Sequence, residues 1–91
     1  MNALPEHGAA TQISTPEFDA RFDRLPPTVQ TRIREKIDDM GTRLGRFPHF
    51  RMTDSVRYRL RVGNHRVIYR FDLARGEMFL LTLGHRSEIY R

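Results

Sequence analysis

The sequence VRYRLRVGNHRVIYRF, residues 56–71, constrains the fold most strongly, because it predicts a β-hairpin. Two alternating runs of residues flank Gly63-Asn64, and a two-residue turn that begins with glycine is a strong hairpin signal. This turn fixes which residues face each other across the two strands. The expected pairs are Val62 with His65, Arg61 with Arg66, Arg59 with Ile68, and Arg57 with Arg70.

Because side chains alternate across a strand, one face of this hairpin is apolar and the other is basic. The face expected to lie on the core carries Val56, Tyr58, Leu60, Val62, His65, Val67, Tyr69 and Phe71. The other face carries Arg57, Arg59, Arg61, Arg66 and Arg70, interrupted only by Ile68. Like charges that face each other destabilise a sheet, so the facing arginines indicate a surface for an anionic ligand. The alternative is a solvated face that is merely basic.

The distribution of charge favours nucleic acid as that ligand. The net charge is +5, and 15 of the 16 basic residues are arginine, the exception being Lys36. Residues 1–54 contain eight basic and eight acidic residues, whereas residues 55–91 contain eight arginines and three acidic residues. Arginine suits bidentate recognition of phosphate, and a basic stripe on a small domain is typical of nucleic-acid binders. An acidic protein partner would suit the same charge.

Length and composition limit the domain organisation. The 91 residues predict a single small domain over residues 11–91 after a flexible lead over residues 1–10. There is no cysteine, which excludes disulfides and thiolate metal sites and fits a reducing cytoplasm. We expect no cofactor and no bound metal. No apolar run is long enough to span a membrane, and the N-terminus lacks the features of a signal peptide.

The remaining sequence predicts two helices and further strands. A short strand is expected over residues 12–14, and Thr15-Pro16 is a typical helix start. Two stripes with helical spacing follow, separated by Pro26-Pro27: Phe18, Phe22 and Leu25, then Val29, Ile33, Ile37, Met40 and Leu44. Gly45 can cap the second helix, and residues 45–55 are expected to form a loop. The apolar run over residues 78–83 predicts a strand that is covered on both sides.

Two motifs carry a resemblance to a known family. The helical hairpin, then YRLRVGNHRVIY, then a buried strand and GHRSEIYR resemble the RelE/ParE superfamily of toxins from type II toxin–antitoxin pairs, closer to RelE. The resemblance covers about residues 12–91. It implies an α+β fold in which an N-terminal helical hairpin packs on one face of a small antiparallel β-sheet. It also implies a cognate antitoxin as a hetero-oligomeric partner.

The resemblance also implies functional residues. RelE-like members cleave mRNA, usually in the ribosomal A site, with basic residues on the hairpin that match Arg59, Arg61 and Arg66. An arginine after the last strand matches Arg86, and a terminal tyrosine matches Tyr90. RelE carries lysines on the first hairpin strand where this chain has arginines. The chain stops one residue after Tyr90, so we expect it to lack the C-terminal helix of some relatives.

Metal-independent RNA cleavage also needs a general base, which arginine cannot supply. The candidates are His85, His49 and, less favoured, Glu88, whereas His65 falls on the core face. Arg57, Arg70 and His49 are further candidates for binding RNA. Two alternatives remain: a ParE-like inhibitor of DNA gyrase without nuclease activity, and a catalytically inactive relative that binds its antitoxin.

Overall fold

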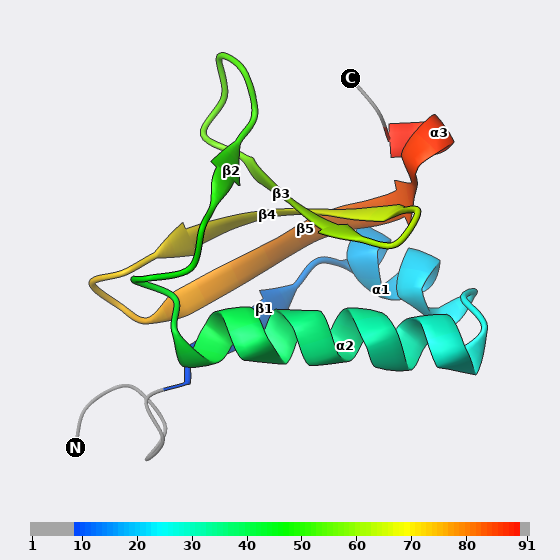
Figure 1. Ribbon diagram of the computed structural model, residues 1–91, viewed down its shortest axis with the longest axis horizontal. Helices are drawn as coiled ribbons and strands as arrows, with labels where there is room; N and C mark the ends of the chain where they lie inside the picture. The colour runs from blue at the N-terminus through cyan, green and yellow to red at the C-terminus, as the bar shows by residue number, and fades with distance from the viewer. Residues whose placement is uncertain (1–8, 90–91) are drawn as a thin grey trace.

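The computed structural model describes residues 9–89, which form one five-stranded sheet and three helices. The elements are β1 (Thr11–Ser14), α1 (Pro16–Asp23), α2 (Pro27–Thr42), β2 (Phe50–Arg51), β3 (Tyr58–Val62), β4 (His65–Asp72), β5 (Glu77–His85) and α3 (Arg86–Ile89). The strand order is β1-β5-β4-β3-β2, and only β1 pairs in parallel, with β5. Figure 1 shows α1 and α2 beneath the sheet, which confirms the α+β fold expected from the sequence.

The start of α1 confirms the expected cap. Thr15 Oγ1 accepts a hydrogen bond from the Phe18 N–H at 3.0 Å, and Pro16 occupies the first helical turn, where its missing N–H costs nothing. The Thr15 hydroxyl also donates to the Leu81 carbonyl at 2.6 Å. One residue therefore both begins α1 and ties it to β5.

The second helix confirms the predicted stripe but ends earlier than expected. Ile33, Ile37 and Met40 are buried under the sheet. The helix ends at Thr42, so the prediction that Gly45 caps it is wrong. Gly41 has a different role within the last turn: its carbonyl accepts from the Ala10 N–H at 2.9 Å, and a Cβ there would lie 3.0 Å from Met78 Cε. Close packing against β5 therefore accounts for this glycine.

The hairpin turn and its register are as the sequence predicts. Gly63 has a φ of 60°, and the pairs Val62–His65, Arg61–Arg66 and Arg59–Ile68 are all present. The Arg57–Arg70 pair is wrong, because β3 begins only at Tyr58.

Residues 52–57 explain the missing pair, because they leave the sheet as a loop. The Met52 N–H donates to the Arg57 carbonyl at 2.8 Å, and Asp54 has a positive φ of 52°. Val56 is consequently 64% exposed, so its predicted place in the core is also wrong.

The core lies on the helix-covered face of the sheet. Its strand residues, each at most 5% exposed, are Leu60, Val62, Val67, Tyr69, Met78, Leu80 and Leu83. Both helices pack on this same face, so the prediction that β5 is covered on both sides is wrong. Phe79 and Leu81 are only partly buried. The register shifts at Ile68/Tyr69, where Leu81 has no partner on β4.

The lead predicted over residues 1–10 lies mostly outside the described residues. Ala10 is described, and it is buried against α2 through its hydrogen bond to Gly41. Within residues 9–89, no helix has the length and apolar character needed to cross a membrane.

Candidate functional site

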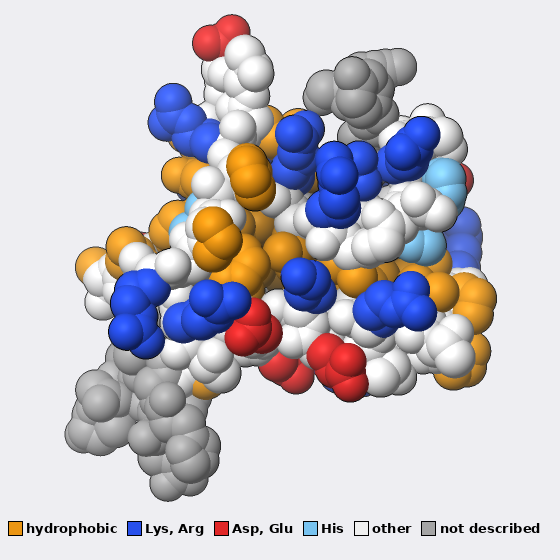
Figure 2. Space-filling model, in the orientation of Figure 1, with side chains coloured by type: hydrophobic (Ala, Val, Ile, Leu, Met, Phe, Trp, Pro, Cys, Tyr) orange, Lys and Arg blue, Asp and Glu red, His pale blue; other side chains and the backbone are white. Residues whose placement is uncertain are grey.

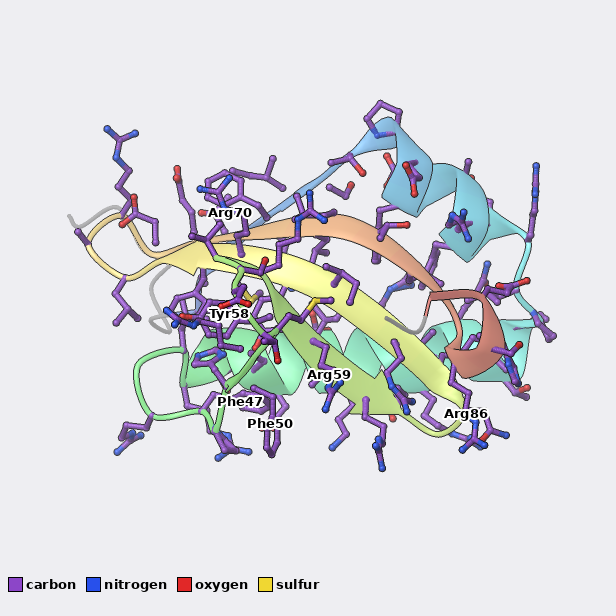
Figure 3. The ribbon with its side chains drawn as sticks, turned by 90° about the horizontal axis from the view of Figure 1, so that it is seen from above. Phe47, Phe50, Tyr58, Arg59, Arg70 and Arg86 are labelled. Carbon is purple, nitrogen blue, oxygen red and sulfur yellow. The ribbon has the colours of Figure 1, made fainter. Side chains whose placement is uncertain are left out.

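Four arginines gather on the open face of the sheet, the face opposite α1 and α2. We call Arg59, Arg61, Arg66 and Arg86 the arginine patch. The register places Arg61 directly beside Arg66, and Gly84 on the other side of Arg66 adds no side chain to the face. The Arg86 N–H donates to the Asn64 carbonyl at 2.7 Å, so the start of α3 is held against the hairpin turn. Figure 3 shows Arg59 near the middle of the sheet and Arg86 at the end beside α3.

The shape of the molecule partly encloses this face. In Figure 1, β2 and the 52–57 loop rise above one end of the sheet, and α3 rises above the other. Figure 2 shows basic side chains gathered along this upper region, with few acidic groups beside them.

The electrostatics of Arg66 show how crowded the positive charge is. Partial burial lowers the pKa of Arg66 below its usual value. The neighbouring guanidinium groups lower it further, Arg61 most and then Arg59 and Arg86. Within residues 9–89, no member of the patch forms an ion pair. The patch therefore holds positive charge that an anion, such as a phosphate group, would neutralise.

Arg57 and Arg70 lie outside the patch. Arg70 is on the open face, opposite Phe79 and two residues beyond Ile68, the cross-strand partner of Arg59. Figure 3 places Arg70 at the opposite end of the sheet from Arg86. Arg57 is exposed in the loop before β3, where its N–H donates to Ser55 Oγ at 2.9 Å. Arg70 therefore borders the patch on its Arg59 side, whereas Arg57 lies in the loop.

The structure does not bring His85 and Glu88 into the patch. The His85 ring lies on the helix-covered side, 5.7 Å from the ring of His65. Its Nδ1 accepts from the Ser87 N–H at 3.2 Å, and Glu88 Oε1 accepts from the His85 N–H at 3.1 Å. Both side chains thus stabilise the start of α3. Residues Arg86–Ile89 form this short helix, which no sequence pattern indicated.

His49 is half-buried, and both of its ring nitrogens have partners inside the molecule. Its Nε2 lies 2.8 Å from the Leu44 carbonyl, which can only accept, so Nε2 carries the proton. The Tyr69 hydroxyl, 2.5 Å away, then donates to Nδ1. Burial raises the pKa of Tyr69, which keeps this hydroxyl a donor. The His49 ring stacks on the Phe71 ring, with 4.1 Å between the two ring centroids.

Tyr90 lies outside the described residues. The part of the chain that the structure describes contains no group of three or more histidine, cysteine or acidic side chains placed to hold a metal ion.

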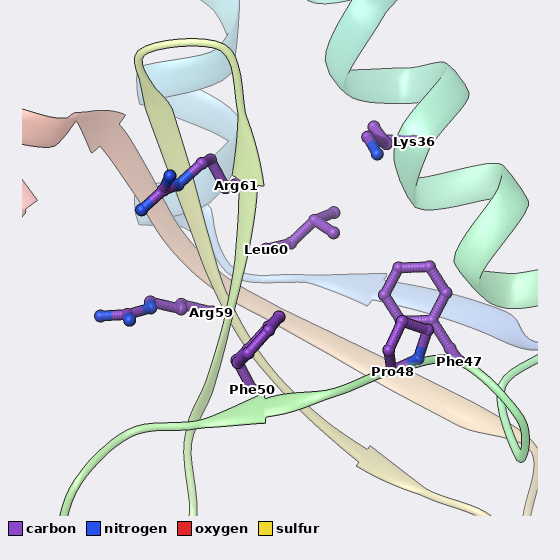
Figure 4. A pocket seen from close by; sticks show the side chains of 7 residues that line it. All are labelled: Lys36, Phe47, Pro48, Phe50, Arg59, Leu60 and Arg61. Atoms are coloured by element: carbon purple, nitrogen blue, oxygen red, sulfur yellow. The ribbon is translucent and has the colours of Figure 1, made fainter.

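Sequence reasoning missed a pocket that adjoins the patch. It has a volume of about 360 Å³ and lies between the β3 edge, α2 and the start of β2 (Figure 4). Its lining residues are Lys36, Phe47, Pro48, Phe50, Arg59, Leu60 and Arg61. The only sequence signal was a pair of aromatic residues in a basic loop, without the periodicity that reveals a strand or helix.

Comparison with known proteins identifies the family. The ParE toxin family of type II toxin–antitoxin systems (parDE) matches residues 13–90, most of the chain. The chain is a toxin of the RelE/ParE superfamily. No match was found among curated proteins.

Solved structures show that the toxin has the RelE fold. The toxin–antitoxin complex RelBE2 from Mycobacterium tuberculosis matches with a TM-score of 0.72 and 22% identity, over 87% of this chain and 93% of that one. The isolated RelE toxin from E. coli matches with a TM-score of 0.72 and 17% identity, over 90% and 92%. The RelE–RelB complex from Pyrococcus horikoshii matches with a TM-score of 0.70 and 20% identity, over 86% of this chain and 96% of that one. The matching family is ParE, whereas these matching structures are RelE proteins.

Proposed function

We propose that this toxin is an endoribonuclease that cleaves mRNA by attack of a ribose 2′-hydroxyl, and so inhibits translation in the cytoplasm. The observation that carries the proposal is the arginine patch: four guanidinium groups on one open face, with no ion-pair partner among residues 9–89. This arrangement is costly for the fold, because Arg61 and Arg66 face each other directly. A bound phosphodiester would offset that repulsion.

The reaction follows from the chemistry of RNA. The 2′-oxygen forms a bond to its own 3′ phosphorus while the bond from phosphorus to the 5′-oxygen breaks. The 2′-hydroxyl loses its proton and the leaving 5′-oxygen gains one, so the products are a 2′,3′-cyclic phosphate and a 5′-hydroxyl end. Charge develops on the phosphoryl oxygens in the transition state, and fixed guanidinium donors stabilise that charge. Arg66 and Arg86, at the centre and end of the patch, are proposed for this role, with Arg59 and Arg61 binding the flanking phosphates.

The proton transfers need a group other than arginine. The ring of His85 and the carboxylate of Glu88 are used in stabilising α3, and both nitrogens of His49 are bonded inside the molecule. We therefore propose that charge stabilisation by the patch provides most of the catalysis. Tyr90 would orient the nucleophile or stack on a base, and the ribosomal A site would position the mRNA.

We also propose that a cognate antitoxin covers this face. The relatives from M. tuberculosis and P. horikoshii were solved as toxin–antitoxin complexes. An acidic or amphipathic segment of a partner would complement the arginine patch. Mixing toxin with the antitoxin should therefore suppress RNA cleavage.

Inhibition of DNA gyrase is the second candidate, and the match to the ParE family favours it. A gyrase inhibitor needs no catalytic constellation, so the two candidates differ in what the arginine patch must do. One experiment separates them. Purified toxin is incubated with mRNA, with and without translating ribosomes, and with gyrase and relaxed plasmid. The nuclease proposal predicts RNA fragments with 5′-hydroxyl and 2′,3′-cyclic phosphate ends and unchanged supercoiling. If the toxin inhibits supercoiling and leaves the RNA intact, the nuclease proposal is wrong and the gyrase proposal takes its place.

A further inference from the structure

Phe50 is an exposed aromatic residue at the border of the arginine patch. Its side chain is 66% exposed, the highest value among the large hydrophobic residues of the described chain. Phe50 is the cross-strand partner of Arg59, so the two residues lie next to each other across β2 and β3. An exposed phenylalanine costs free energy in water. Its position beside the patch suggests a ligand with both an apolar surface and negative charge.

The pocket next to Phe50 has the composition that such a ligand requires. Phe47, Pro48 and Leu60 give it an apolar lining, and Figure 4 shows Leu60 directed toward α2 while Arg59 and Arg61 extend away from it. Lys36 lies on the α2 side. No acidic side chain lines the pocket. The apolar cavity therefore opens between positively charged groups on two sides.

We propose that this pocket binds one unpaired base of single-stranded RNA, stacked on Phe50, with the adjoining phosphate at Arg59. The inference rests on the proposed function and extends it by naming a base-binding site. Stacking of unpaired bases on aromatic side chains is the usual way in which proteins hold single-stranded RNA. Arg59 and Arg61 lie two residues apart on one face, roughly 7 Å along the strand. Successive phosphates of an extended strand can therefore follow them toward Arg66.

The geometry favours a base over a peptide strand as the occupant. β2 already pairs with β3 at Phe50–Arg59 and Arg51–Tyr58, so an added strand could reach only residues 60–62 of that edge. The volume of about 360 Å³ is also at the lower end of small-molecule sites. It suits one planar ring system better than an extended segment of protein.

The test measures binding without cleavage. Fluorescence anisotropy with a fully 2′-O-methylated single-stranded RNA removes the nucleophile, so affinity is measured apart from activity. Phe50→Ala should weaken binding about 5- to 150-fold, the range expected for loss of one stacked base. Phe50→Trp should keep the affinity, whereas Phe50→Leu, which is apolar but cannot stack, should lose most of it. The matched control is Leu73→Ala, an exposed apolar residue at 56% between β4 and β5.

A second measurement keeps the test independent of how the variant folds. Single abasic nucleotides are placed along the same RNA and bound to the unaltered toxin. One position should weaken binding as much as Phe50→Ala does, and at that position Phe50→Ala should add nothing.

The outcomes separate this inference from the proposed function. If the toxin binds and cleaves RNA but Phe50→Ala binds as tightly as the unaltered toxin, the base pocket is overturned and the nuclease proposal stands. If Phe50→Ala weakens binding of the antitoxin but not of RNA, the pocket belongs to the protein partner and the inference is also overturned. If the unaltered toxin neither binds the methylated RNA nor cleaves mRNA with or without ribosomes, both proposals fall.

Discussion

The two faces of the β3–β4 hairpin have opposite chemistry although they are built from alternate residues of the same strands. On the helix-covered face, Leu60, Val67 and Tyr69 are at most 5% exposed. On the open face, Arg59 and Arg61 are exposed, and Arg61 faces Arg66 across the hairpin. Burial on the first face supplies the stability that the repulsion on the second face reduces. Stability and activity should therefore respond to different substitutions, even between neighbouring residues.

The largest effect on stability should come from the helix-covered face. Leu83 is fully buried on β5, opposite Val67. Leu83→Ala should lower the free energy of unfolding by about 2–5 kcal/mol, because it removes buried methyl groups and leaves a cavity. Urea unfolding followed by circular dichroism measures this. A loss below about 1 kcal/mol would show that this face is not the source of stability.

Substitutions in the arginine patch should have the opposite effect. Arg66→Ala and Arg86→Ala should each reduce RNA cleavage about 10²–10³-fold, by analogy with the loss of an oxyanion-hole donor. The free energy of unfolding should stay the same or rise, because charge repulsion is relieved. Arg59→Lys is the conservative control, since it keeps the charge and should retain activity. Equal losses of stability and activity in Arg66→Ala would contradict the separation of the two faces.

Tyr90 should contribute less than the patch. Tyr90→Ala should cost ~1–3 kcal/mol in RNA binding if its ring stacks on a base. Tyr90→Phe keeps the ring and removes the hydroxyl, so it distinguishes stacking from orientation of the nucleophile. Single-turnover cleavage and binding to 2′-O-methylated RNA are measured for both variants. No change in either measurement would remove Tyr90 from the site.

The smallest effect should be a pH dependence of stability from His65 on the helix-covered face. Burial first, and then His85, lowers the pKa of His65 below its ordinary value of 6.5. The unfolded chain then binds more protons than the folded one, so this contribution to stability is present at neutral pH. It is lost as the pH falls through 6.5 toward the folded pKa. Urea unfolding at pH 8 and pH 5 should show that the free energy of unfolding falls less in His65→Gln than in the unaltered toxin. An identical fall in both proteins would contradict the assignment to His65.

The elements that follow local rules were predictable from the sequence. Gly63-Asn64 and strict alternation set the hairpin register, and Thr15-Pro16 set the start of α1, because each depends on residues close in sequence. The arginine patch follows from that register. Its extension to Arg86 came from the family resemblance rather than from any local pattern.

The features that depend on distant contacts could not be predicted. Leu81 of β5 has no partner on β4. Its carbonyl accepts a hydrogen bond from the hydroxyl of Thr15, which is 66 residues away in sequence. The role of His49 depends on Tyr69, which only the folded sheet brings to it. Residues 52–57 likewise leave the sheet, so Arg57 is not paired in the hairpin and Val56 is not in the core, although alternation alone predicted both.

The most direct test of the central claim is the toxicity of Arg66→Ala/Arg86→Ala. The unaltered toxin and the double variant are induced in cells without antitoxin, growth is followed, and 5′ ends of mRNA are mapped. Circular dichroism of the purified double variant confirms that it is folded. We predict that the toxin stops growth and produces new 5′ ends, whereas the folded double variant allows growth and produces none. Growth arrest by the folded double variant would contradict the nuclease function of the arginine patch, and inhibition of gyrase would become the leading explanation.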